Sequence, residues 1–512
     1  MPKSDSLFLL IKSLLPAEKR YFKLYSNKHV IGEENNYVRL FDAINSMEHY
    51  SEADLKSILL RRFPGEKFVN HLTSEKSRLF KIILQSLRSY RSEKSISRKL
   101  IDMIEDAQIL TNKKLYDQAA KVLAKAEDLA RQHEDFLILF RVQELMRTQI
   151  QVNETSNIKK KILEVIEQSD DTCKRLFNQI QIQNLYDLTY SIARINFSTR
   201  MQESQNEISE IESHSILASS ENALSIAAKL RYHATHAIIG KMKNDIHTVY
   251  EHWEQSLEIL KGNPIRLQEE IRQYIIVTAN FVNVCIQMRE YERIAEVVTS
   301  FRDLRDLSPE TGTELTHNIF HIELLASLNS GNLERALDIA SDVFSWLESN
   351  ANVVNTSRVI TLYYNLGILH FLESNFASAE MCLRKVIDHS KSEVRQDLQS
   401  SARLLLPLVL FSCGKSDMLE SYVRSAQYYL DSRNSLLKFE QLMIKFLRGL
   451  ERCGAPNHCS ETIVDCADSL SEHIKDNLQS LRPGMKEAHY WLQAQVMKVP
   501  VKSIYLEDLK NH

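Results

Sequence analysis

A two-helix unit recurs every forty-odd residues through the middle of this chain, and its clearest copy is Ile360–Asp388. Apolar residues at spacings of three and four predict two amphipathic helices in this copy, with Ser374–Asn375 as the turn between them. A repeated unit of this length buries its apolar face only against its neighbours. The repeat therefore favours an extended helical array over one compact enzyme core.

Glycine and proline are scarce, which supports the same interpretation. The chain has 11 Gly and 9 Pro among 512 residues, or about 4%, against ~12% in average usage. Tightly turned sheets, Gly-rich phosphate loops and disordered linkers all need these residues. Their scarcity predicts long helices joined by short turns, and Ser51, Asn263 and Ser308 are expected to cap the helices that follow them.

Weaker copies of the unit are in phase with the clearest one. Ala379 is the small residue in the second helix of the clearest copy. Taken with it, the equivalent positions of the other copies are Val249, Ile294, Ala336, Ala379 and Leu419, at intervals of 45, 42, 43 and 40 residues. A further copy starts at Leu115–Tyr116. Pro407 falls inside a first helix and predicts a kink there.

These residues resemble the tetratricopeptide repeat. The family's aromatic residue, Leu-Gly pair, small residue and large apolar residue correspond to Tyr363, Leu366–Gly367, Ala379 and Leu383, while Lys391 stands where the family has a closing proline. The family's period is ~34 residues, so each helix pair here is longer by about two to three turns. The resemblance covers about half of the chain and implies a right-handed superhelical solenoid.

We therefore expect an all-α chain in three regions. Residues 1–100 form a basic helical region, residues 101–430 form the solenoid of long antiparallel helix pairs, with a less regular stretch at 141–220, and residues 431–512 are helices that close the array. The segment Leu10–Ser26 also resembles the start of some uncharacterised bacterial helical-repeat proteins.

The resemblance implies a groove lined by side chains of the first helices. Some members of the family clamp a partner's C-terminal carboxylate with Lys, Asn and Arg. Asn280, Asn283 and Asn365 match the asparagine positions, but no lysine matches beside them. The alternative is that these polar side chains are simply solvated. The candidate groove residues are Arg231, Asn280, Asn283, Asn318, His321, Tyr364 and Asn365.

Charge is distributed unevenly along the chain. The net charge is −3, but residues 1–100 hold 19 Lys and Arg against 11 Asp and Glu. Arg78, Lys81, Arg88 and Arg91 are spaced to share one flank of a helix and meet phosphates. The alternative is an amphipathic helix with a charged outer face, because apolar residues interleave with these cations.

Metal-binding and catalytic signals are weak. Cys453, Cys459, Cys466, His458 and His473 cluster in sequence, but without the tight Cys-x-x-Cys spacing of structural zinc sites. His233 and His236 are three apart with nothing nearby to complete a site. No phosphate-binding glycine loop, Gly-x-Ser-x-Gly elbow or His-Glu-x-x-His motif is present. We expect no enzyme, no cofactor and no metal.

The remaining sequence evidence concerns location and partners. The seven cysteines are odd in number and spread along the chain, which favours a reducing compartment. No apolar run reaches the ~18 residues that a membrane span needs. We expect a cytoplasmic scaffold or adaptor that binds a protein or peptide in the solenoid groove. The alternative is a regulator whose basic N-terminal region contacts nucleic acid while its repeats sense a partner. The sequence alone leaves the partner and the oligomeric state open.

Overall fold

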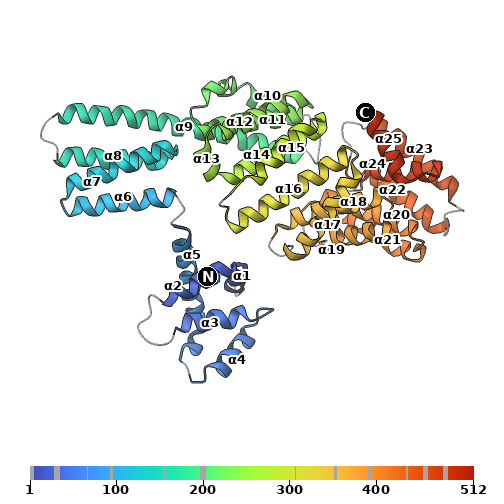
Figure 1. Cartoon of the computed structure of the whole chain (residues 1–512), viewed down its shortest axis with the longest axis horizontal. Coiled ribbons are helices and arrows are strands. Elements are labelled where there is room, and N and C mark those ends of the chain that lie inside the picture. The colour runs from blue at the N-terminus through green and yellow to red at the C-terminus, as the bar shows by residue number, and fades with distance from the viewer. Residues whose placement is uncertain are drawn as a thin grey trace. The chain divides into compact units, whose positions relative to one another are not determined.

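The computed structural model is helical in every element that it describes, as the sequence predicts (Figure 1). It describes residues 5–27, 35–65, 67–92, 96–153, 157–196, 203–305, 307–350, 354–389, 394–433, 436–453, 459–476 and 482–511. Lys391 and His458 lie outside these residues.

The described residues form two compact units. Unit 1 comprises residues 1–184 and 221–228, and unit 2 comprises residues 185–220 and 229–512. The chain passes from one unit to the other three times: within α9 (Ile158–Asn196), within the 3-10 turn η3 (Ser220–Asn222) and within α11 (Ile226–Met242). The three regions expected from the sequence stay a prediction.

Unit 1 contains two hydrophobic core clusters. The first five helices pack around a core that includes Phe22 and Phe41, whose rings stack with centroids 4.6 Å apart. They are α1 (Ser6–Ser13), α2 (Pro16–Asn27), α3 (Asn36–Asn45), α4 (Glu52–Arg62) and α5 (Leu72–Ser92). The next helices pack in sequence around Leu123 and Leu139, and α9 follows them. They are α6 (Ile96–Asn112), α7 (Tyr116–Gln132) and α8 (Phe136–Asn153).

Unit 2 is a succession of helix pairs followed by a closing group. The pairs include α11 with α12 (Ile246–Lys261), α14 (Ile271–Met288) with α15 (Tyr291–Arg302), α16 (Pro309–Asn329) with α17 (Leu333–Asn350), α18 (Thr356–Leu372) with α19 (Phe376–Asp388), and α20 (Gln396–Ser412) with α21 (Leu419–Ser432). The other helices are α10 (Glu203–Glu212), α13 (Pro264–Glu269), α22 (Lys438–Cys453), α23 (Ser460–Asp476), α24 (Met485–Met497) and α25 (Val501–Asn511). In each pair we call the members the first and the second helix.

One turn geometry joins the two helices of the pairs. A residue with a left-handed backbone follows the first helix, and the amide of the next residue bonds back into the last turn of that helix. In the clearest copy, Ser374 has φ +58° and the amide of Asn375 donates to the carbonyl of His370 at 2.8 Å. The Ser374–Asn375 turn is therefore confirmed. Left-handed residues occupy the equivalent place at Lys114, Asn244, Arg289, Gly331 and Gly414.

Helix capping agrees with the sequence at two of three expected positions. The hydroxyls of Ser51 and Ser308 accept the amides of Asp54 and Thr311, as expected for N-caps. Asn263 precedes Pro264 at a helix start, but its side chain makes no capping bond. The helix α20 continues through Pro407, and a kink there stays a prediction.

The two helices of the clearest pair approach closely where the sequence is small. Ala379 is fully buried, and a Cβ placed on Gly367 would lie 3.0 Å from the side chain of Leu383. Leu383 therefore fills the space that the missing side chain of Gly367 leaves. Val249, Ile294, Ala336 and Leu419, which occupy the position of Ala379 in the other pairs, are also buried.

Truncating Leu383 tests whether this contact holds the pair together. Because Leu383 is completely buried, Leu383→Ala is expected to destabilise unit 2 by about 2–5 kcal/mol. Met381→Ala is the matched control, since Met381 lies on the same helix with 41% of its surface exposed. The chain's 3 tryptophans, Trp253, Trp346 and Trp491, all lie in unit 2, so their fluorescence during guanidinium unfolding reports on this unit. Equal midpoints for the two variants would contradict the assignment.

Candidate partner-binding surface

The first helices of unit 2 pack against one another as a row. The helices α14, α16, α18 and α20 contact each other in that order, and Figure 1 shows the succession. We call these four helices the first-helix row. Six of the seven candidate groove residues belong to it, because equivalent positions of successive pairs are brought side by side.

The structure places the first four candidates in different environments. Arg231 lies on α11, where its guanidinium stacks 4.8 Å from the ring centroid of Tyr186. Asn280 is half-buried on α14, whereas Asn283 on the same helix is exposed. Asn318 is buried on α16, and its amide donates to the carbonyl of Glu314 at 2.8 Å. Of these four, Asn283 is the most open to a partner.

The other three candidates lie deeper in the row. The amide nitrogen of Asn365 lies 3.3 Å from Nδ1 of His321, so these two predicted residues are brought together across α16 and α18. Tyr364 is 5% exposed, and its hydroxyl lies 2.8 Å from that of Ser401 on α20. Burial raises the pKa of Tyr364 well above its usual range. Tyr364 therefore joins two helices instead of lining an open groove.

Sequence reasoning missed a polar ladder near the N-terminal ends of the row. The carboxylate of Glu314 on α16 pairs with Arg272 of α14 at 3.4 Å and also with Arg358 of α18. Arg395, just before α20, donates to the hydroxyl of Thr361 on α18 at 2.8 Å. Arg272 and Arg358 are two repeat intervals (86 residues) apart, which is the one signal in the sequence that could have found them, and Arg395 follows 37 residues later. Arg395 also pairs with the carboxylate of Asp397 at 2.8 Å, so the ladder holds three arginines and two carboxylates.

Two buried histidines lie beside the polar ladder. His317 and His321 are one turn apart on α16 with their rings stacked 6.0 Å apart. Burial, with the neighbouring His321 and Arg358, lowers the pKa of His317 to about 3. Burial, with Arg395, lowers the pKa of His321 to about 4. Both rings are therefore neutral at neutral pH, so they add no charge to this cationic region.

The opposite end of the row is covered by the chain's own C-terminus. The helices α24 and α25 pack against each other, with a left-handed backbone at Lys498 between them (φ +58°), and we call them the C-terminal hairpin. The helix α24 contacts α20, where the indole of Trp491 donates to the hydroxyl of Ser412 at 2.9 Å. Glu487 of α24 lies near Tyr364, and burial raises its pKa. The hairpin therefore accounts for the burial of Tyr364.

The helix α25 crosses the turn ends of three pairs. Its Tyr505 hydroxyl donates to the carbonyl of Leu328 at the end of α16. The carbonyl of Leu509 accepts a bond of 3.0 Å from Arg289 in the α14–α15 turn, and Lys502 pairs with Glu373 after α18 at 3.0 Å. A Cβ on Gly331 would lie 3.0 Å from Leu506 of α25. One amphipathic helix is thus seated on turns that lie more than a hundred residues away in the sequence.

The cysteines and histidines that suggested a metal do not assemble a site in the described part of the chain. Within it, no group of three or more His, Cys, Asp or Glu side chains is arranged to hold a metal ion. Burial raises the pKa of Cys459 and of Cys466 to about 12. Both thiols are therefore protonated at neutral pH in the metal-free chain.

His233 and His236 pack against a third histidine instead. Nδ1 of His233 lies 2.9 Å from Nδ1 of His252 on α12, and the rings of His236 and His252 stack 4.8 Å apart. Burial, with mutual repulsion among the rings, lowers the pKa of His233 and of His252 to about 4. The histidine side chains of this cluster are neutral, and they join α11 to α12.

The basic helix predicted in the N-terminal region is α5. Leu79 and Ile83 are fully buried, whereas Arg78, Lys81 and Arg88 are exposed. The side chain of Arg91 lies outside the described residues. The helix is therefore amphipathic with a charged outer face, and contact with nucleic acid stays a prediction.

In the ranges that the structure covers, every helix lacks the length or the apolar content of a membrane-spanning segment. No protein-family model, no curated protein and no solved structure matches the chain.

Replacing His317 tests the electrostatics beside the ladder. A histidine whose pKa is lowered on folding takes up its proton in the unfolded chain first. For His317 the stability therefore falls as the pH drops from about 6.5 toward about 3. His317→Leu removes this contribution, and the loss of stability between about pH 7.5 and about pH 5 is expected to shrink by about 2 kcal/mol. Tryptophan fluorescence during guanidinium unfolding at both pH values measures it. The exposed His247 provides the control His247→Leu, and an identical pH dependence for the two variants would refute the argument.

Proposed function

We propose that this chain is a non-catalytic interaction scaffold that holds an amphipathic helix of a protein partner along the turn ends of its first-helix row. In this proposal unit 2 is a right-handed solenoid of the tetratricopeptide type with lengthened helices. The observation that carries the proposal is that α25, a helix of the chain itself, already occupies this surface.

The contacts of α25 define the partner by its chemistry. Val501, Tyr505 and Leu509 are spaced four residues apart and so share one helix face, and Val501 and Tyr505 are buried. Tyr505 adds a hydrogen bond to a backbone carbonyl, and Lys502 adds an ion pair. Helix recognition by apolar anchors at such spacing is a recurrent mode of peptide binding. The proposed partner helix therefore presents an aromatic residue with an aliphatic residue one turn to each side.

The rest of the row supplies polar contacts for a longer partner. Asn283 is exposed on α14, and Arg272 of the polar ladder has 65% of its side chain exposed. An acidic segment adjoining the apolar helix would meet this cationic end. The proposal places the protein in the cytoplasm of a bacterial cell, supported by its odd cysteine count and by the resemblance of its N-terminal segment.

Removing α25 tests the surface directly. A chain ending at Met497 is expected to bind a labelled peptide of residues 501–511, measured by fluorescence anisotropy. The full-length chain is expected to bind it at least about tenfold more weakly, because its own α25 competes. A Tyr505→Ala peptide should lose most of the affinity. In the truncated chain, Asn283→Ala is the matched substitution outside the α25 contacts and should leave peptide affinity unchanged.

Capture from cells then connects this surface to a partner. The truncated chain should retain a protein that the free peptide releases, and nuclease should not affect its recovery. Failure of the truncated chain to bind the peptide would overturn the helix-binding surface, and recovery lost with nuclease would favour the alternative function below.

The alternative is a regulator that contacts nucleic acid through α5, favoured by the exposed cations on that helix. It predicts an affinity for nucleic acid that falls steeply with salt, in proportion to the phosphates neutralised. The double variant Arg78→Glu, Lys81→Glu should flatten this dependence, whereas Lys385→Glu on the exposed face of α19 should not. Affinity that is absent at low salt would exclude this function.

A further inference from the structure

The longest described helix carries an exposed apolar stripe in unit 1. The stripe consists of four exposed apolar side chains of α9: Leu163 by 54%, Ile166 by 38%, Phe177 by 61% and Ile180 by 47%. Ile158, Leu188 and Tyr190 of the same helix are exposed as well. Cys173 on the same helix is also exposed. Such a run of exposed apolar residues on one helix marks an interaction surface more often than chance.

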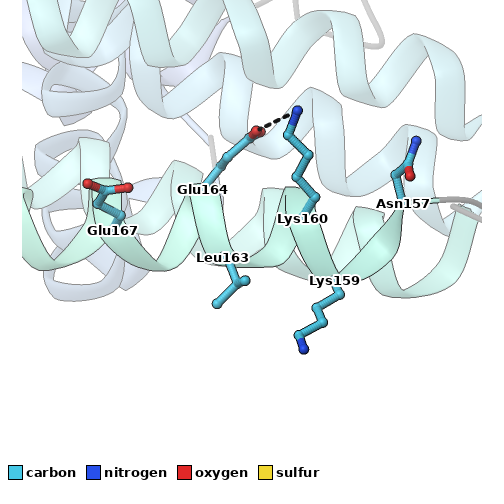
Figure 2. Close-up of a pocket in the computed structure, with 6 residues that line it drawn as sticks. All are labelled: Asn157, Lys159, Lys160, Leu163, Glu164 and Glu167. Carbon is cyan, nitrogen blue, oxygen red and sulfur yellow. Dashed lines mark ion pairs between the residues drawn. The ribbon is translucent and has the colours of Figure 1, made fainter.

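The stripe borders the face that α9 packs inside its own unit, since exposed Ile166 directly follows buried Val165 and exposed Cys173 directly follows buried Thr172. Val165, Ser169 and Thr172 are buried, and the hydroxyl of Thr172 accepts the side-chain amide of Gln143 on α8 at 3.2 Å. Figure 2 shows Leu163 and Lys159 projecting from α9 on the side away from the neighbouring ribbons. The pocket whose lining residues Figure 2 labels is formed only by α9 and by Asn157, the residue before it. It is therefore open surface and not an enclosed ligand site.

The spacing of the stripe is that of a two-helix seam. Leu163, Ile166, Asp170, Cys173, Phe177 and Ile180 follow one another at alternating steps of three and four. This 3.5-residue period keeps a seam facing a second helix, whereas a helix packed in a globular core follows a period of 3.6. The partner that the stripe fits is therefore another helix running along it.

We propose that the occupant is α9 of a second copy of this chain, lying antiparallel about a two-fold axis. In this arrangement Leu163 faces Ile180 of the second copy, and Ile166 faces its Phe177. Asp170 then faces Cys173 of the second copy. Each apolar side chain of the stripe meets an apolar side chain, and the contact is self-complementary as a two-fold interface requires.

Charges flanking the stripe select the same arrangement. Glu167 and Lys174 occupy equivalent flanking positions one heptad apart, and both are exposed. The antiparallel pairing brings Glu167 of each copy to Lys174 of the other, so this ion pair forms twice. A parallel pairing in register would instead place Asp170 against Asp170 and form no such pair. Antiparallel pairing is therefore the arrangement that the charges stabilise.

Sedimentation equilibrium of the full-length chain over a concentration series tests the proposal. A monomer–dimer equilibrium is expected. Phe177→Asp should weaken association at least about a hundredfold, because it places a charge in the seam. Glu167→Lys or Lys174→Glu alone should weaken it about tenfold, and the double variant should recover most of the loss. These residues are exposed, so circular dichroism and the unfolding midpoint should stay unchanged.

Cross-linking then fixes the orientation. Asp170→Cys places a cysteine opposite Cys173 of the second copy, and mild oxidation should give a disulfide-linked dimer. Asp171→Cys, which points off the seam, is the matched control and should give little dimer. A chain that stays monomeric, or a dimer insensitive to Phe177→Asp, would overturn the proposal. A dimer whose charge reversals are not rescued by the double variant would exclude the antiparallel arrangement.

Discussion

The close approach of the two helices within each pair is the contact on which the rest of unit 2 depends. In the clearest pair, the absent side chain of Gly367 lets Leu383 pack directly on the backbone of the first helix. A left-handed residue at Ser374 reverses the chain within two residues. Pairs built in this way repeat their geometry, so their first helices align. Only this alignment lets side chains some forty residues apart, such as Arg272 and Glu314, meet across neighbouring helices.

The two ends of the first-helix row differ in chemistry, and this difference gives the row a direction. One end holds the ladder of Arg272, Glu314 and Arg358 with the neutral histidines beside it. The other end offers apolar surface around Gly331 and the accepting carbonyl of Leu328, which α25 uses. A partner helix that is apolar at one end and acidic at the other would match both ends of the first-helix row in only one orientation. Charge therefore contributes to the choice and orientation of a partner more than to its raw affinity.

The sequence predicts the features that are local in the chain. Apolar spacing located the helix pairs, and the small residues at Ala336 and Ala379 marked the buried contacts. Hydroxyl caps such as Ser51 follow from the first turn of the helix that they begin. These features depend on residues a few positions apart, which is why one sequence is enough to find them.

What the sequence missed depends on contacts between distant segments. Tyr364 has the position of a groove residue, yet Glu487 and the hairpin that carries it lie over that part of the row. No pattern around Tyr364 encodes this, because the covering helix is more than a hundred residues away. His321 and Asn365 were assigned to separate pairs and meet because equivalent positions of adjacent first helices are neighbours. The burial of a candidate residue therefore requires the tertiary structure, even where its position on the helix is correct.

The two proposed surfaces belong to different units, and this separation has a thermodynamic consequence. The stripe on α9 lies within unit 1, whereas α25 and the first-helix row lie within unit 2. The two surfaces share no residue, so in the proposed antiparallel dimer each copy would bring its own helix-binding surface. A partner with two copies of its helix then gains affinity from the second contact without any new interaction, as long as its linker spans both surfaces. Because α25 competes at each surface, a single partner helix binds only those chains in which α25 is displaced. Its apparent affinity is therefore its intrinsic affinity multiplied by the fraction of such chains. A bivalent partner offsets this reduction, so dimerisation would favour paired helices over single ones.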